Sequence, residues 1–287
     1  MAVRGILDTP PAKMTPSSPA VVLSQLQHKD LRMFLLAAKS FSEQVPISHV
    51  YVVNDGSLDS DDKAILKAHF PAFTLFELAD FRSQSCPTGS CWERLLSIAE
   101  LVKDHYVIQL DSDTLTVGDV PELRANIENG IAFTIGTFAN QGLETMRERC
   151  EIMRARNFGP DAHVQQLAES NFDKLRNCDS MRYVKGCAGF TSFSQGSFTR
   201  AFVEEISSEM EAAIGTKWRE WGSEQVMSNI VVANIPGAVV LPYPKYSDCL
   251  NIKKGETAFI HFIGTCRFDR GVYAELGSKL IRSLRQA

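Results

Sequence analysis

Short apolar runs alternate with amphipathic segments along the first part of the chain, up to residue 113. Runs rich in β-branched residues predict strands, and apolar residues at helical spacing predict helices. Leu31, Phe34 and Leu35, for example, share one face of an expected helix that Asp30 precedes as N-cap. The expected strands are 20–26, 50–53, 74–77 and 106–110, and the expected helices are 30–41, 61–69 and 91–103. This alternation predicts a parallel α/β sheet with right-handed crossovers.

The second half of the chain mixes strands and helices without an internal repeat. A single domain over residues 20–287 fits this pattern better than two small domains. Residues 9–19 hold four prolines among serine and threonine, so we expect residues 1–19 to form a disordered leader. The expected strands are 131–138, a glycine-interrupted 184–193 and 258–262, and the expected helices are 144–156, 161–177, 198–214, 223–232 and a last one from 272.

Composition narrows the class of protein. Hydrophobic residues make up 44% of the 287 residues, enough for a core that needs no disulfide bonds. The net charge of −4 gives no reason to expect a nucleic-acid partner. The seven cysteines, an odd number at irregular spacings, are typical of reduced thiols in a cytoplasmic protein. No apolar stretch approaches the roughly 20 residues of a membrane-spanning helix, so we expect no transmembrane segment.

An acidic pair follows the apolar run at 106–110, and it is the strongest single motif. Asp111 and Asp113, separated by Ser112, come at the carboxyl end of an expected strand, where ligands of such sheets bind. Two carboxylates there can share one hard cation and leave positions for phosphate oxygens. Such a metal neutralises charge on a departing diphosphate. The same spacing recurs at Asp59 and Asp61 on an expected surface loop, so the pattern alone does not identify a metal site.

The same stretch also matches a second class of enzyme. Asp111, Asp113 and Thr114 after an apolar strand resemble the nucleophile motif of haloacid-dehalogenase-like phosphatases, in which the first aspartate attacks phosphorus. Lys185 or Lys253 would then supply the lysine that these enzymes need. Their later acidic pair has no counterpart on an apolar strand here, and a whole strand–helix region precedes the motif. The phosphatase remains the alternative interpretation.

Four segments read together resemble the GT-A glycosyltransferases, especially the glycogenin- and galactosyltransferase-like members. The segments are 52–57, 89–95, 110–123 and 260–264, and in family order they span nearly the whole chain. The resemblance implies the GT-A fold and a metal-dependent glycosyltransferase that uses a nucleotide-diphosphate sugar, with UDP as the expected nucleotide. Residues 20–123 would form the nucleotide-binding half and 124–287 the half that meets an acceptor of unknown kind (glycan, lipid, protein or small molecule).

The resemblance also assigns site residues. His261 would complete a metal site with Asp111 and Asp113, and an imidazole beside two carboxylates suits Mn²⁺, with Mg²⁺ as the alternative. Glycines allow close approach of a ligand to the backbone, so residues 185–190 would line the donor sugar, and a forked arginine side chain suits diphosphate oxygens. The expected contacts to the nucleotide sugar are Asn54, Asp55, Arg94, Ser112, Lys185, Gly189 and Arg267.

Glu224 and Gln225 occupy the place where the family has an acidic or amide residue near the reacting carbon. A carboxylate there can act as general base in an inverting transferase or position the donor sugar in a retaining one. Ser223 is expected to cap the helix that carries them. The late histidine favours retention, although this chain has Glu-Gln where Asp-Gln is typical and lacks the usual Lys-Pro-Trp ending. Two further classes compete, a sugar-nucleotide pyrophosphorylase and a binding protein without activity; the first lacks its glycine-rich loop after the first strand.

Overall fold

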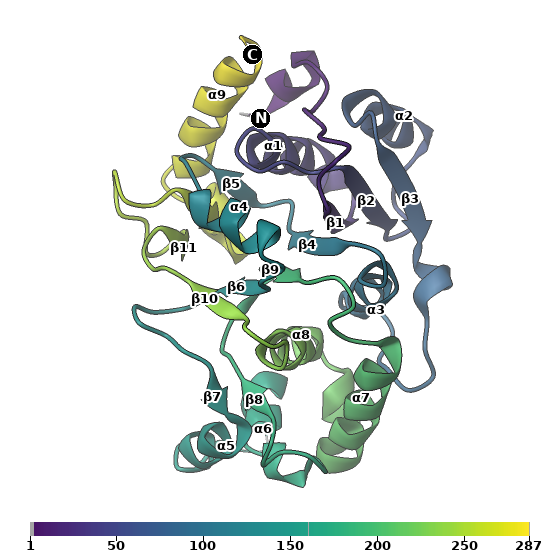
Figure 1. The fold of residues 1–287 in the computed structure, drawn as a ribbon, viewed down its shortest axis with the longest axis vertical. Coiled ribbons are helices and arrows are strands. Elements are labelled where there is room, and N and C mark those ends of the chain that lie inside the picture. Colours follow the sequence, from purple (N-terminus) through teal and green to yellow (C-terminus); the bar gives the residue numbers. More distant parts are fainter. Residues whose placement is uncertain (1–2, 160, 287) are drawn as a thin grey trace.

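A seven-stranded sheet forms the centre of the computed structural model, which describes residues 3–159 and 161–286 (Figure 1). The strand order is β10-β6-β9-β4-β1-β2-β3, and β1 to β4 run parallel, as the alternating pattern predicts. β9 is antiparallel to both of its neighbours, β4 and β6. The strands are β1 (Ala20–Leu26), β2 (His49–Asn54), β3 (Phe73–Glu77), β4 (Tyr106–Leu110), β6 (Phe133–Ile135), β9 (Cys187–Phe193) and β10 (Val239–Leu241).

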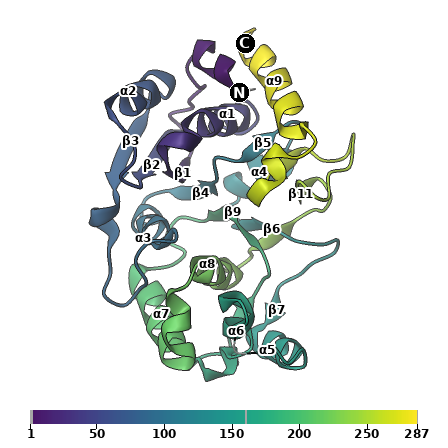
Figure 2. The same ribbon diagram turned by 180° about the vertical axis from the view of Figure 1, so that it is seen from behind.

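Each face of this sheet is covered by helices. The side chains of β1 alternate between two buried clusters, with Val22 and Leu26 in one and Val21 and Leu23 in the other. A strand buried on both faces is largely apolar, which explains the continuous apolar run over the first four residues of β1. The helices on the first side are α1 (Leu31–Ser42), α2 (Ser60–His69), α4 (Pro121–Glu128) and α9 (Val272–Leu284) (Figures 1 and 2). Those on the second side are α3 (Trp92–Leu101), α5 (Met146–Arg154), α6 (Val164–Glu169), α7 (Arg200–Ile214) and α8 (Ser223–Ala233).

A smaller sheet brings the end of the chain to the acidic pair. It consists of β11 (Tyr246–Asp248), β12 (Phe259–His261) and β5 (Thr114–Thr116), in that order. β12 runs antiparallel to β5, and His261 is the register partner of Thr114, the residue that follows Asp113. The backbone N–H of Phe262 donates to the carbonyl of Asp113 at 2.8 Å. This pairing, rather than any local pattern, positions the histidine.

The expectation of a disordered leader is wrong for the described residues of that segment, 3–19. A 3₁₀ helix spans Arg4–Asp8, and Ile6 is fully buried in the first cluster. The amide of Ala12 donates to the carbonyl of His69, and Lys39 Nζ lies 2.7 Å from Thr9 Oγ1. Proline-rich composition lowers the entropy that ordering costs, so these few contacts are enough to hold an extended segment. Residues 1–2 lie outside the described part.

Other expectations need smaller corrections. The strand expected at 131–138 shrinks to β6, and the helix expected at 161–177 divides into α6 and a 3₁₀ turn. Asp30 precedes α1, but its side chain makes no capping hydrogen bond. A short strand pair, β7 (Glu144–Thr145) with β8 (Arg182–Tyr183), and strands β10 and β11 were not expected. No helix in the described part of the chain has both the length and the apolarity to cross a membrane.

Two of the seven cysteines are not free thiols. A disulfide joins Cys249, just after β11, to Cys266 in a 3₁₀ helix at Gly264–Phe268. The expectation of reduced thiols is therefore wrong for this pair, because spacing along the chain does not show which segments the two sheets bring together. The inference of a cytoplasmic protein loses its support from the cysteine pattern, since such bonds are typical of oxidising environments.

Candidate functional site

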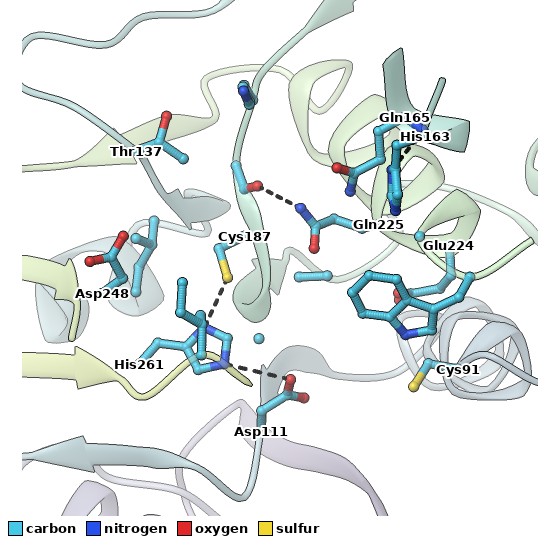
Figure 3. Close-up of a pocket in the computed structure, with 18 of the residues that line it drawn as sticks. Cys91, Asp111, Thr137, His163, Gln165, Cys187, Glu224, Gln225, Asp248 and His261 are labelled. Carbon is cyan, nitrogen blue, oxygen red and sulfur yellow. Dashed lines mark hydrogen bonds and ion pairs between the residues drawn. The ribbon is translucent and has the colours of Figure 1, made fainter. Parts of the chain in front are cut away.

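A cavity of about 650 Å³ opens beyond the end of β4 and beside the start of β9 (Figure 3). Its walls come from the first turns of α3 and α8, from α6 and from the ends of β6, β11 and β12. The predicted site residues that line it are Arg94, Asp111, Asp113, Lys185, Gly189, Glu224, Gln225 and His261. The predicted residues outside its lining are Asn54, Asp55, Ser112 and Arg267.

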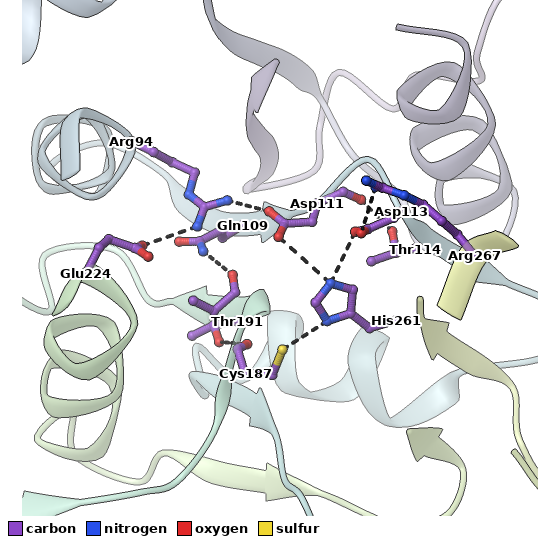
Figure 4. A network of polar contacts seen from close by, with 11 residues as sticks. Arg94, Gln109, Asp111, Asp113, Thr114, Cys187, Thr191, Glu224, His261 and Arg267 are labelled. Atoms are coloured by element: carbon purple, nitrogen blue, oxygen red, sulfur yellow. Dashed lines mark hydrogen bonds and ion pairs between the residues drawn. The ribbon is translucent and has the colours of Figure 1, made fainter. Parts of the chain in front are cut away.

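Three candidate metal ligands converge at one wall of this cavity. One ligand atom from each of Asp111, Asp113 and His261 lies within 4.8 Å of the others. His261 Nε2 is 3.1 Å from Asp113 Oδ1 and 3.9 Å from Asp111 Oδ2 (Figure 4). Two hydrogen bonds to the main chain of Asp111 fix the turn that carries Asp111 and Asp113. The amide of Asp111 donates to the carbonyl of Gly189, and Thr114 Oγ1 donates to the carbonyl of Asp111. Two carboxylates and an imidazole fit Mn²⁺ or Mg²⁺ as a donor set.

Strand β9 holds the histidine ring in place. A Cβ atom added to Gly189 would lie 2.2 Å from Cε1 of His261, so the ring rests directly against the backbone of a residue that must be glycine. At the edge of the ring, Nδ1 lies 2.9 Å from Sγ of Cys187, on the same strand (Figure 4). The glycine thus allows the backbone of β9 to pack closely against a candidate metal ligand.

Arg94 connects the acidic pair to the start of α8. Its buried guanidinium forms ion pairs with Asp111 and, at 3.3 Å, with Glu224 (Figure 4). Burial raises the pKa of Glu224 to about 7, although the charge of Arg94 opposes the rise. The arginine expected at the nucleotide therefore lies between two carboxylates on the cavity wall.

The turn after β2 lies outside the cavity lining. Asn54 donates to Glu77 and accepts from the amide of Gly56, while Asp55 accepts from the amide of Ser57, so these side chains shape the turn. Burial raises the pKa of Asp30, and the charges of Arg267, Asp113 and Asp55 also act on this carboxyl. Of these groups, Asp113 lines the cavity, whereas Asp30, Asp55 and Arg267 lie outside its lining.

Three remaining candidates occupy different surroundings. Arg267 Nη1 donates to Asp113 Oδ2 at 3.2 Å, and Arg267 Nε is buried without a partner among the described residues. Gln225 Nε2 approaches the carbonyl of Gly186 at 3.5 Å. The carbonyl of Lys185 accepts from Gln141 Nε2, while its side chain contributes to the cavity wall.

The two lysines that were alternatives for the phosphatase lie in different places. Lys185 lines the cavity that contains Asp111, whereas Lys253 lines a separate one beside α9. The carboxylate of Asp111, the nucleophile that the phosphatase interpretation requires, forms an ion pair with Arg94. The second Asp-x-Asp sequence is a helix cap, because Asp59 accepts from the amide of Asp62 in a capping box that begins α2.

Sequence reasoning missed several cavity residues. Trp221 is 72% exposed, packs edge-on against His163 at a centroid distance of 5.9 Å and lines the cavity. The sign in the sequence that could have found Trp221 was its position just before Glu224 and Gln225.

The expected cap of α8 is wrong. Ser223 is not the cap, because Gly222 takes that position at φ 101° and Ser223 Oγ instead accepts from Trp92 Nε1.

Comparison with known proteins identifies the class of fold. No family model matches the chain, and no curated protein matches it. An active-site variant of the glycosyltransferase LgtC is 14% identical over 92% of this chain and 95% of its own, with a TM-score of 0.52. The apo form of the glycosyltransferase GlyE from Streptococcus pneumoniae is 12% identical over 92% of this chain and 62% of its own, with a TM-score of 0.51.

Core-mannan synthase A from Aspergillus fumigatus, solved in its Mn/GDP form, is 12% identical over 78% of this chain and 72% of its own, with a TM-score of 0.43. The two structures with the higher TM-scores show that the chain has the GT-A fold, which confirms the predicted fold class. This architecture does not favour the phosphatase alternative.

Proposed function

We propose that this protein is a metal-dependent glycosyltransferase that moves a sugar from a UDP-sugar to an acceptor hydroxyl, with retention of configuration. The observation that carries the proposal is the convergence of Asp111, Asp113 and His261 in the cavity of a GT-A fold. The turn after β4 supplies the first two residues and β12 the third, so side chains far apart in the sequence share one cation-sized space.

Mn²⁺ is the proposed ion, because an imidazole beside two carboxylates suits it better than an all-oxygen set would. When bound, the ion supplies charge neutralisation for a departing diphosphate. Arg267 would also neutralise charge on the diphosphate. Its guanidinium lies beside Asp113, and its buried Nε donor lacks a partner among the described residues. A buried unpaired donor is costly, and a phosphate oxygen would satisfy it.

The transfer forms a bond from the acceptor oxygen to the anomeric carbon and breaks the bond from that carbon to the diphosphate oxygen. The bonding electrons leave with UDP, and the acceptor's proton passes to the departing oxygen. Glu224 and Gln225 are assigned to orientation of the donor sugar, because Arg94 holds the Glu224 carboxylate at the cavity wall. Lys185 and Gly189 would line the sugar, with Asn54, Asp55 and Ser112 toward the nucleotide.

Calorimetric titration of UDP into the purified protein, with and without Mn²⁺, tests the proposal. We expect binding that requires the ion and that weakens by at least about tenfold in Asp113→Asn, which loses a charged ligand. Asp59→Asn is the matched control, because Asp59 has the same motif spacing but caps a helix, and asparagine caps as well. Absence of UDP binding in both conditions would contradict the UDP assignment, and GDP would then be titrated in its place.

A further inference from the structure

The two ring nitrogens of His261 face different partners. Nε2 points to the acidic pair, at 3.1 Å from Asp113 Oδ1, while Nδ1 points to Cys187 Sγ at 2.9 Å (Figure 4). The proposed metal ligand is thus contacted on its far side by a thiol from another strand. A neutral imidazole carries its single proton on one nitrogen, and the hydrogen bond of that nitrogen decides which one it is.

We propose that Cys187 is a positioning residue, which accepts the Nδ1–H of His261 and so leaves the Nε2 lone pair directed at the metal. This inference rests on the metal site of the proposed function. Partners on the far nitrogen of a ligating histidine fix its tautomer and ring orientation. They are usually carboxylates or backbone carbonyls, and here a sulfur atom takes that place.

The thiol is fixed by the start of β9. Cys187 is the register partner of Ile135, where the pairing of β9 with β6 shifts by an irregularity between Thr134 and Ile135. Such irregularities turn a side chain away from its regular direction. Thr191 Oγ1 donates to the carbonyl of Cys187 at 2.9 Å and also bonds to Thr134 Oγ1, which ties the backbone on both sides of this irregularity.

The ring has little freedom to choose another partner. Its face rests on the backbone of Gly189, two residues beyond Cys187 on the same strand. His261 is also buried, and its backbone is tied at two points, since its carbonyl accepts from Cys249 and the next residue, Phe262, donates to Asp113. β9 therefore sets the ring plane through Gly189 and its rotation through Cys187.

Mn²⁺ titration of three purified variants tests the assignment. Cys187→Ala removes the acceptor, so we expect Mn²⁺ affinity to fall about tenfold to a hundredfold. Cys187→Ser keeps an acceptor of similar size, so it should recover most of that affinity. Cys91→Ser is the matched control, because Cys91 also lines the cavity but lies across it from His261 (Figure 3), and its affinity should equal that of the wild type. Unchanged affinity in Cys187→Ala would overturn the proposal.

A metal-free measurement separates this inference from the proposed function. Imidazole ¹⁵N NMR of metal-free proteins that carry Asp113→Ala, which removes the carboxylate facing Nε2, reports the tautomer of each neutral histidine, and the signal missing in an Asp113→Ala/His261→Asn protein assigns this one. In this background we expect the proton on Nδ1 when Cys187 is present and in Cys187→Ser, and a mixture in Cys187→Ala. A proton on Nε2 in the Asp113→Ala protein that retains Cys187 would overturn the role of Cys187. Failure of the wild type to bind Mn²⁺ would instead refute the metal site.

Discussion

At the scale of single residues, charge in this site is arranged around one arginine. Arg94 is buried between Asp111 and Glu224, so two carboxylates share one guanidinium and the group of three carries a net negative charge when all are ionised. A cation at the acidic pair would offset that surplus. Burial meanwhile favours the neutral form of Glu224, and its pKa rises to about 7.

This pKa predicts a specific dependence of stability on pH. Between about 4.5, the ordinary value, and about 7, folded Glu224 holds a proton that the unfolded chain releases. Its contribution is therefore complete below the lower value and falls as the pH rises through this window, by on the order of 3 kcal/mol in the metal-free protein. Urea unfolding of wild type and Glu224→Gln across these pH values measures it. Glu224→Gln should lack this pH-dependent part of the unfolding free energy, while the exposed control Glu220→Gln should retain it. An equal dependence of the unfolding free energy on pH in the wild type and in Glu224→Gln would contradict the assignment.

Gly189 gives a second residue-scale prediction. Alanine there would place Cβ 2.2 Å from Cε1 of His261 and displace the ring, because the rest of the strand is held in the sheet. We expect Gly189→Ala to weaken Mn²⁺-dependent UDP binding roughly tenfold or more. Gly142→Ala is the matched control, since nothing lies within 4 Å of its added Cβ. Calorimetry on both proteins checks the pair, and equal binding would show that the ring is not a ligand.

At the scale of elements, the early strand–helix units could be predicted because their information is local. The apolar run of β4 and the acidic residues after it are enough to predict that Asp111 lies at a strand end. The position of His261 could not be obtained this way, because β5 is only three residues long and pairs with a strand more than a hundred residues later. The same holds for the contacts of Arg94 and for Cys187, whose direction depends on an irregular pairing.

The disulfide belongs to the same scale, because it closes the segment that carries β12. Cys249 and Cys266 are 17 residues apart, and a loop of that length predicts about 3 kcal/mol of stabilisation through the unfolded chain. We expect Cys249→Ser/Cys266→Ser to lose about that much in urea unfolding. Reductant should destabilise the wild type to the same level and leave the double variant unchanged. A wild type indifferent to reductant would mean that the bond does not form in solution.

At the scale of the whole molecule, the 3₁₀ helix at Arg4–Asp8 and α9 lie side by side (Figures 1 and 2), and neither lines the cavity. Arg285, after α9, donates to the carbonyl of Gly5 and pairs with Asp8 at 2.7 Å. The N-terminal segment therefore closes the first helical layer against α1 and α9, and it contributes to the core rather than to the site. Composition alone predicts that this segment is disordered, because it reflects the four prolines and does not reveal that Ile6 is buried.

Ile6 supplies the test of this arrangement. Its side chain is fully buried in the first cluster, so Ile6→Ala should cost about 2–4 kcal/mol of unfolding free energy through lost burial and a residual cavity. Arg4→Ala, in the same 3₁₀ helix but exposed, should change stability by less than about 0.5 kcal/mol. Mn²⁺-dependent UDP binding should be equal in both variants, since the segment does not line the cavity. Urea unfolding decides the matter: an Ile6→Ala protein as stable as the wild type would mean that the segment is not packed in solution, and the core would then have to close without it.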